Sequence, residues 1–156
     1  MTDATPGPVE RVYREEGERL WRAVFAYAGD RGVADDAVAE AFAQALQRGN
    51  GIRDVDRWVW TAAFRITRGE LARRGKRDGG VIETTYELAE PADDIVQALS
   101  SLSPKQRAAV VLHHYAGYRV KEIAEMLDST GPAVRVHLSQ GRKRLRTILT
   151  EVNISE

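Results

Sequence analysis

Residues 118–149 read YRVKEIAEMLDSTGPAVRVHLSQGRKRLRTIL, and this stretch is the clearest structural signal in the chain. Apolar residues fall at helical spacing over 120–127, and residues 128–131 form a cluster that favours a turn. Pro132 suits the first turn of a new helix, because its missing N–H is not needed there. The stretch therefore predicts a helix that ends near Leu127, a tight turn and a second helix, which is a helix-turn-helix.

The second predicted helix has one apolar face and one basic face. Its inward positions are Val134, Leu138, Gly141, Leu145 and Ile148. The outward face carries basic residues and residues 129–150 contain no Asp or Glu, although the whole chain balances 23 basic against 23 acidic residues. A basic helix face is often only solvated, but on the second helix of such a pair it favours DNA binding through phosphate contacts.

Position along this helix distinguishes two predicted roles, contact with base edges and contact with phosphates. Residues near its start enter the major groove and are candidates for contacts to base edges: Ala133, Arg135, Val136, Ser139 and Gln140. Later residues are candidates for phosphate contacts: Arg142, Lys143, Arg144 and Arg146.

A clearly punctuated helix precedes this motif. Ser103 is a predicted N-cap, Pro104 falls in the first turn, Gln106 completes a capping box, and Gly117 follows the end. A shorter segment over 93–102 precedes it. The predicted inward residues of these two segments are Ile95, Val96, Leu99, Leu102, Ala108, Val111, Leu112 and Tyr115. Residues 93–156 are thus predicted to form a C-terminal helical domain.

The N-terminal half predicts three amphipathic helices, which is enough for a small bundle. The first follows residues 1–8 and ends at Gly29; the second spans about 33–48, and the third about 54–74. Predicted inward positions include Leu20, Val24, Val38, Phe42, Leu46, Val59 and Ile66. Residues 75–92, with Gly79-Gly80 and Pro91, predict a flexible linker between domains 1–74 and 93–156. The predicted fold class is all-α: two small helical bundles joined by this linker.

Several motifs resemble those of bacterial RNA polymerase sigma factors, especially the short extracytoplasmic-function group of the sigma-70 family. Leu102-Ser103-Pro104, Glu122-Ile123-Ala124 and Arg142-Lys143-Arg144-Leu145 match the habitual pattern of region 4. Residues 35–42, DDAVAEAF, and Trp58 are similar to region 2. The similarity covers most of the chain, with both regions in the usual order.

This resemblance implies a sigma factor that binds core RNA polymerase and promoter DNA, is restrained by an anti-sigma factor, and is not an enzyme by itself. Region 4 would read the minus-35 element, and region 2 would help to recognise and open the minus-10 element. The implied polymerase-binding residues are Asp36, Glu40 and Gln44. The implied minus-10 residues are Asn50, Trp58, Trp60, Arg65, Arg73 and Arg74.

Other interpretations remain open for parts of this pattern. Trp58 and Trp60 are at least as often core residues of a small bundle as DNA-binding ones. The acidic residues of 35–40 also fit an ordinary solvated helix start. The alternative function is a stand-alone helix-turn-helix repressor or activator, although no dimerisation helix is left over. A DNA-processing enzyme lacks support, since no nucleophile with a base and no phosphate-binding glycine loop is present.

Composition bounds the setting of the protein. There is no cysteine, no apolar run long enough to span a bilayer and no N-terminal leader, so we expect a cytoplasmic bacterial protein without membrane insertion. The three histidines lack cysteine or carboxylate partners at ligand spacing, so no metal and no cofactor are expected.

Overall fold

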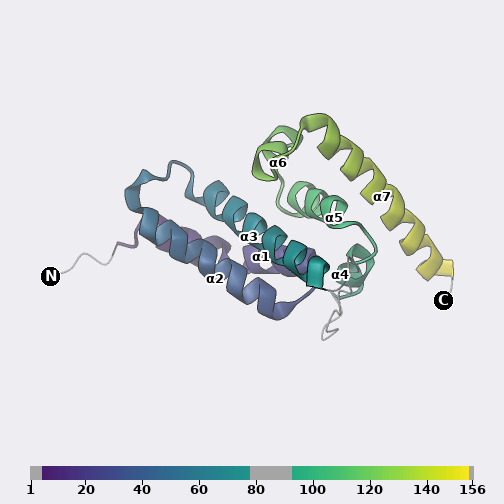
Figure 1. Ribbon diagram of the computed structural model, residues 1–156, viewed down its shortest axis with the longest axis horizontal. Coiled ribbons are helices and arrows are strands. Elements are labelled where there is room, and N and C mark those ends of the chain that lie inside the picture. Colours follow the sequence, from purple (N-terminus) through teal and green to yellow (C-terminus); the bar gives the residue numbers. More distant parts are fainter. Residues whose placement is uncertain (1–4, 78–92, 155–156) are drawn as a thin grey trace.

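The computed structural model describes residues 5–77 and 93–154, and within these ranges the chain forms helices joined by turns. The N-terminal half is a bundle of three long helices: α1 (Pro8–Ala28), α2 (Arg31–Arg48) and α3 (Val55–Arg77) (Figure 1). A 3-10 turn, η1 (Gly49–Gly51), follows α2. The linker predicted over 75–92 starts as the end of α3, and the rest of it lies outside the described residues.

Local sequence signals set the ends of these helices. Gly29, with φ of 71° in the left-handed helical conformation, closes α1, and Gly49, with φ of 67°, closes α2; positive φ favours glycine at both positions. Asp30 caps α2, because its Oδ1 accepts a hydrogen bond from the Val33 N–H at 3.0 Å. Asp54 does the same for α3 with the Arg57 N–H at 3.1 Å.

The C-terminal half packs short helices against one long helix. Its elements are α4 (Asp93–Leu99), α5 (Pro104–Val110), the π-helical turn η2 (Val111–Tyr115), α6 (Val120–Met126) and α7 (Gly131–Ile154). The predicted capping box is present, with Ser103 Oγ accepting from the Gln106 N–H and Gln106 Oε1 accepting from the Ser103 N–H, each at 3.2 Å. The all-helical prediction, with two helical parts and a helix-turn-helix in the second, is confirmed.

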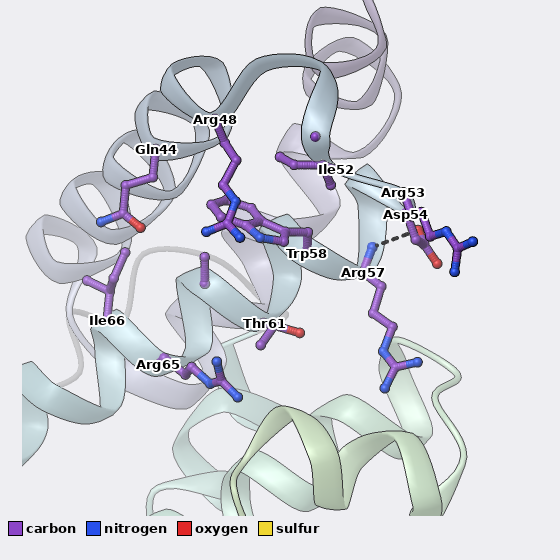
Figure 2. Close-up of a pocket in the computed structure, with 12 residues that line it drawn as sticks. Gln44, Arg48, Ile52, Arg53, Asp54, Arg57, Trp58, Thr61, Arg65 and Ile66 are labelled. Carbon is purple, nitrogen blue, oxygen red and sulfur yellow. Dashed lines mark hydrogen bonds between the residues drawn. The ribbon is translucent and has the colours of Figure 1, made fainter.

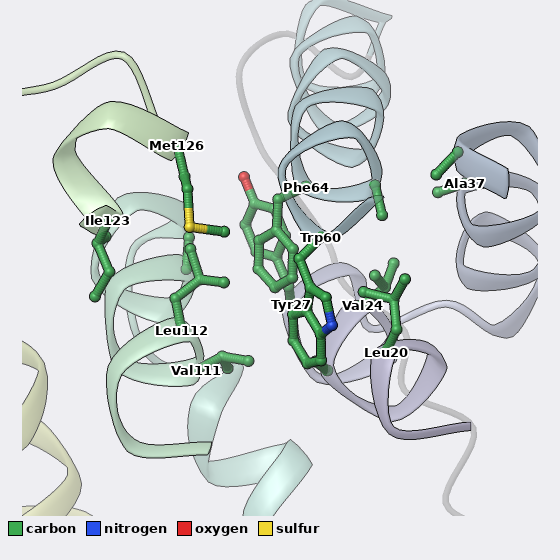
Figure 3. Close-up of a cluster of buried hydrophobic side chains, with 14 of the residues drawn as sticks. Leu20, Val24, Tyr27, Ala37, Trp60, Phe64, Val111, Leu112, Ile123 and Met126 are labelled. Carbon is green, nitrogen blue, oxygen red and sulfur yellow. The ribbon is translucent and has the colours of Figure 1, made fainter. Parts of the chain in front are cut away.

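The two halves share one apolar core. Figure 3 shows Leu112 and Met126 of the C-terminal half pointing toward Tyr27 and Phe64 of the N-terminal bundle. Phe64 and Leu112 are fully buried, and Tyr27 and Met126 are exposed by 2% or less. The C-terminal half therefore covers one side of α1 and α3.

Three residues that we predicted to face inward are exposed. The exposed fractions are 65% for Leu46, 65% for Ile95 and 42% for Tyr115. Alanines carry the inward face of α2 near Leu46, and Ala98 and Leu99 carry that of α4. The π-helical turn changes the register after Val111, and Tyr115 instead lies against the Arg19 guanidinium, 5.4 Å from Cζ to the ring centre.

Candidate nucleic-acid interface

The start of α7 presents the residues that we predicted for base contacts. Val134 and Leu138 are buried, so they fix the rotation of the helix and turn Arg135, Val136 and Ser139 outward. Val136 is 52% exposed, so its methyl groups are accessible to an apolar group such as a thymine methyl. Ala133 is half-buried, and its N–H donates to Thr130 Oγ1 at 3.2 Å, which caps the helix.

The last predicted base-edge residue, Gln140, is exposed but already has a partner. Its Oε1 accepts a hydrogen bond from Gln106 Nε2 at 3.1 Å, which links α7 to the capping box of α5. Gln140 therefore needs a side-chain rearrangement before it meets a base.

The position of α7 is set by its close packing against α5. A Cβ at Gly141 would lie 2.8 Å from Val110 Cγ2 and 3.3 Å from Leu102 Cδ2, so only glycine fits at this crossing. Beyond it, Arg142, Lys143, Arg144 and Arg146 are exposed, and their side chains form no ion pair within the described ranges. The structure thus leaves a row of cations open to solvent, as phosphate contacts require.

A cavity of about 490 Å³ lies between α2, η1 and α3 (Figure 2). Trp58, Arg48 and Ile52 line it, and Trp58 is half-buried there. Asn50 lies in η1 beside the cavity and is exposed. An aromatic side chain and cations around a pocket of this size suit an unstacked nucleotide base.

Trp60, the other candidate tryptophan, points away from this cavity into the shared core. It is 1% exposed, its ring centre lies 6.3 Å from that of Phe64, and Tyr118 meets it edge-on at 6.0 Å. Burial raises the pKa of the Tyr118 hydroxyl, and the nearby carboxylates of Asp56 and Asp54 raise it further. Trp60 is inaccessible in this arrangement of the two halves.

The three predicted arginines of α3 have different surroundings. Arg65 is exposed at the edge of the cavity and binds residues of the helix-turn-helix. Arg73 pairs with Glu70 at 2.9 Å, and Arg74 pairs with Asp30 at 3.0 Å, which ties α3 to the start of α2. Hydrogen bonds from Arg73 and Arg74 lower the pKa of Glu70.

The predicted polymerase-binding residues lie together on α2. Asp36 and Glu40 are exposed and line a shallow groove of about 710 Å³ between α2 and α3. Gln44 Nε2 donates to Glu40 Oε1 at 3.0 Å. Asp35 is different, because its Oδ1 accepts a hydrogen bond from the Trp21 indole N–H at 2.6 Å. Within the described ranges, Asp36 is thus the carboxylate of these three that no other side chain binds.

Comparison with known proteins shows what the chain is similar to. The family model for "Sigma-70, region 4" matches residues 92–145, which contain α4 to α6 and the first half of α7. The sigma factor SigL of Mycobacterium tuberculosis is 27% identical over 92% of this chain and 90% of its own length. SigE of Mycolicibacterium smegmatis is 23% identical over 91% of this chain and 62% of its length. Both are named ECF RNA polymerase sigma factors.

Residues 92–145 thus match the sigma-70 region 4 family, and most of the chain is similar to extracytoplasmic-function sigma factors.

Solved structures share the fold of this chain. The sigma factor RpoE, in its complex with the anti-sigma factor NepR from Bartonella quintana, matches with a TM-score of 0.74 at 19% identity, over 90% of this chain and 98% of that one. CnrH, in complex with the cytosolic domain of CnrY, matches with a TM-score of 0.69 at 20% identity, over 92% and 88%. In this chain, none of the described helices combines the length and apolar character needed to cross a membrane.

Several arginines that make contacts between the two halves were not singled out from the sequence. Arg57 and Arg68 lie near Arg65 on α3 and also bind the helix-turn-helix. Their helical spacing with Arg65 was the available signal. Arg107 is 2% exposed, and its Nε donates to the Tyr27 carbonyl at 2.6 Å. A lone arginine in the apolar run 107–112 was the signal for a buried polar contact.

The histidines form no metal site in the described ranges, where no three His, Asp or Glu side chains gather at ligand distance. His113 Nδ1 lies 2.9 Å from the Tyr118 carbonyl oxygen. Burial, and then His113 and Arg142, lower the pKa of His114.

Proposed function

We propose that this protein is a sigma factor that binds core RNA polymerase and directs it to promoters with two elements. The C-terminal domain would read a minus-35 element through α7, and the N-terminal bundle would help to recognise and open a minus-10 element. The observation that carries the proposal is the exposed basic face of α7 on a helix-turn-helix, with Arg135, Val136 and Ser139 at its leading end.

The proposed minus-10 role rests on the cavity beside Trp58. Unstacking a base costs a few kcal/mol, and an aromatic surface with cations around it returns part of that cost. We propose Trp58 and Asn50 as the residues that receive the base, with Arg65, Arg73 and Arg74 along the strand. Trp60 would take part only after the two halves separate, because it is buried between them.

Polymerase binding is proposed for Asp36, Glu40 and Gln44 of α2. The carboxylates of Asp36 and Glu40 are exposed on the groove between α2 and α3, and the half-buried Gln44 amide lies one turn further along α2. An anti-sigma factor is proposed as a second protein partner, because RpoE, which shares this fold, is described in a complex with the anti-sigma factor NepR. These partners would place the protein in the bacterial cytoplasm at the chromosome.

Transcription in vitro tests the proposal. Purified protein is mixed with core polymerase and genomic promoter fragments, and the transcripts are sequenced. We expect specific start sites that core polymerase alone does not use. Tight, specific binding to duplex DNA without polymerase association would instead support a stand-alone repressor or activator.

Two variants of α7 test the division of roles. Arg135→Ala is expected to weaken use of particular minus-35 sequences, since it removes a candidate base contact worth about 1–3 kcal/mol. Lys143→Ala is expected to lower binding evenly across sequences and to reduce the salt slope by about one. Equal, sequence-independent losses from both variants would contradict this division.

A further inference from the structure

Three arginines of α3 are held by the turn of the helix-turn-helix. Arg57 pairs with the Glu125 carboxylate. Arg65 Nη2 lies 3.0 Å from Asp128 Oδ1, and Arg68 Nη2 lies 3.3 Å from Asp128 Oδ2, so one carboxylate binds two guanidinium groups. These partners are 60 or more residues apart in the sequence.

Backbone oxygens at the end of α6 complete the contact. Arg65 Nε donates to the Met126 carbonyl and its Nη2 to the Glu125 carbonyl, each at 3.3 Å. Arg68 Nη1 donates to the Leu127 carbonyl at 2.7 Å. The C-terminal end of a helix carries partial negative charge, so these carbonyl groups attract cations. The arginines therefore meet a cluster of oxygens like that of a phosphate backbone.

The conformation of Asp128 supports a specific role for its carboxylate. Its φ is 52°, and it is the one non-glycine residue with positive φ in the described part of the chain. Glycine is the usual residue directly after a helix in this conformation, and Asp tolerates it less well. The ion pairs with Arg65 and Arg68 on α3 explain why a carboxylate stands at this position.

The charged contacts lie over an apolar contact between the same two halves. Tyr27 and Phe64 are buried against Leu112 and Met126, and Arg107 donates to the Tyr27 carbonyl. Exposed ion pairs alone stabilise a fold weakly. The apolar contact therefore provides most of the free energy that holds the two halves together. The ion pairs of the turn provide a smaller share, and they are the contacts that DNA would replace.

We infer that the free protein closes on itself, with the helix-turn-helix turn occupying a phosphate-binding row formed by Arg57, Arg65 and Arg68. DNA and the turn are alternative ligands of this row. The inference rests on the proposed minus-10 role of α3 and extends it to two further arginines and to a closed, inhibited state. Opening frees the row and uncovers Trp60 at the same time.

Asp128→Asn tests the competition in the full-length chain. Asn keeps the shape and tolerates positive φ, but it removes the charge. Glu18→Gln is the matched control, because Glu18 is an exposed carboxylate that pairs only within α1, with Arg22. Both variants change the net charge equally, so a general electrostatic gain in DNA affinity cancels in the comparison.

Two measurements are made on each protein. The chain has no cysteine, so Gln47→Cys and Lys121→Cys place a donor and an acceptor dye on exposed positions of α2 and α6. Binding to a fluorescent oligo-dT single strand reports access to the row. We expect Asp128→Asn to lower energy transfer and to bind the strand about three- to tenfold tighter than the control, consistent with the loss of two exposed pairs.

The Arg68→Ala variant distinguishes separation of the two halves from binding of DNA. It removes a contact to the turn and a proposed phosphate contact together, so it should lower energy transfer without the gain in DNA affinity. Energy transfer and DNA affinity equal to those of Glu18→Gln would overturn the inference. Opening of Asp128→Asn with no gain in affinity would also overturn it, because the row would then not bind phosphates. Failure of the proposed function is distinct: no variant, nor the wild type, would direct core polymerase to specific starts.

Discussion

Helices α7 and α3 each carry a row of cations on one face, yet only the row on α7 is open. The phosphate candidates of α7 are exposed and have no ion-pair partner in the described ranges. On α3, Arg57, Arg65 and Arg68 bind carboxylates and carbonyl oxygens of the other half. Charge in the sequence therefore marks a possible DNA contact, whereas the fold determines whether that contact is available.

Phe64→Ala tests most strongly whether the two halves unfold together. Phe64 is fully buried and stacks on Tyr27 with ring centres 5.1 Å apart, at the junction of the halves. We expect a loss of about 3–5 kcal/mol in the free energy of unfolding, from lost burial and an unfilled cavity. Urea denaturation followed by circular dichroism measures it. If the halves are coupled, a single transition moves as a whole; a second transition that keeps its midpoint would show independent domains.

Arg107→Ala is expected to have the next largest effect. The buried guanidinium donates to the Tyr27 carbonyl at 2.6 Å and the Leu102 carbonyl at 3.2 Å, so its removal leaves two buried acceptors unsatisfied. We expect a loss of about 2–3 kcal/mol in unfolding free energy. Arg107→Lys should recover part of the loss at most, because a single ammonium cannot reproduce the planar fork. Full stability of the Lys variant would contradict this account of the contact.

Local signals in the sequence predicted most of the fold. Ser103, Gln106 and Gly29 marked helix ends correctly, because caps depend on residues only a few positions apart. Val134 and Leu138 were placed on the inward face of α7 for the same reason, since helical spacing is a local property. The open row on α7 followed from that spacing.

Contacts between distant residues were not predictable in the same way. Arg19 donates to the Tyr115 carbonyl across 96 positions, and no local pattern contains that information. The buried side of α3 with Trp60 and Phe64 exists because the C-terminal half covers it. Tyr115 was misplaced because the π-helical turn shifts the register, which helical spacing does not reveal. The roles assigned to the site residues remain predictions.

The same substitution should have opposite signs in the two halves. Gly141→Ala places a Cβ 2.8 Å from Val110 Cγ2, so α5 and α7 must separate at a cost of about 1–3 kcal/mol. Gly69→Ala in α3 meets only the Arg73 side chain, at 3.6 Å, and should stabilise the helix by about 0.5–1 kcal/mol. Thermal unfolding of both variants checks the signs. A stabilising Gly141→Ala would mean that the crossing of α5 and α7 adjusts freely.

Low pH should slightly reduce the stability of both halves, because each half has one carboxylate at the start of a helix with a lowered pKa. The pKa of Asp30 is lowered below its ordinary value of 3.8, mainly because its carboxylate accepts a hydrogen bond from the Val33 backbone N–H. The pKa of Glu122 is lowered below 4.5, mainly because its carboxylate accepts one from the Arg119 backbone N–H. A lowered pKa adds stability above the ordinary value, and this is lost as the pH falls through the folded value. Asp30→Asn and Glu122→Gln should each flatten the acid-side slope of unfolding free energy against pH, so that at most about 0.5 kcal/mol less stability is lost on acidification after solvent screening. Glu15→Gln, on the exposed face of α1, is the control. A slope that changes for only one of the two variants would show that the halves do not share this acid response.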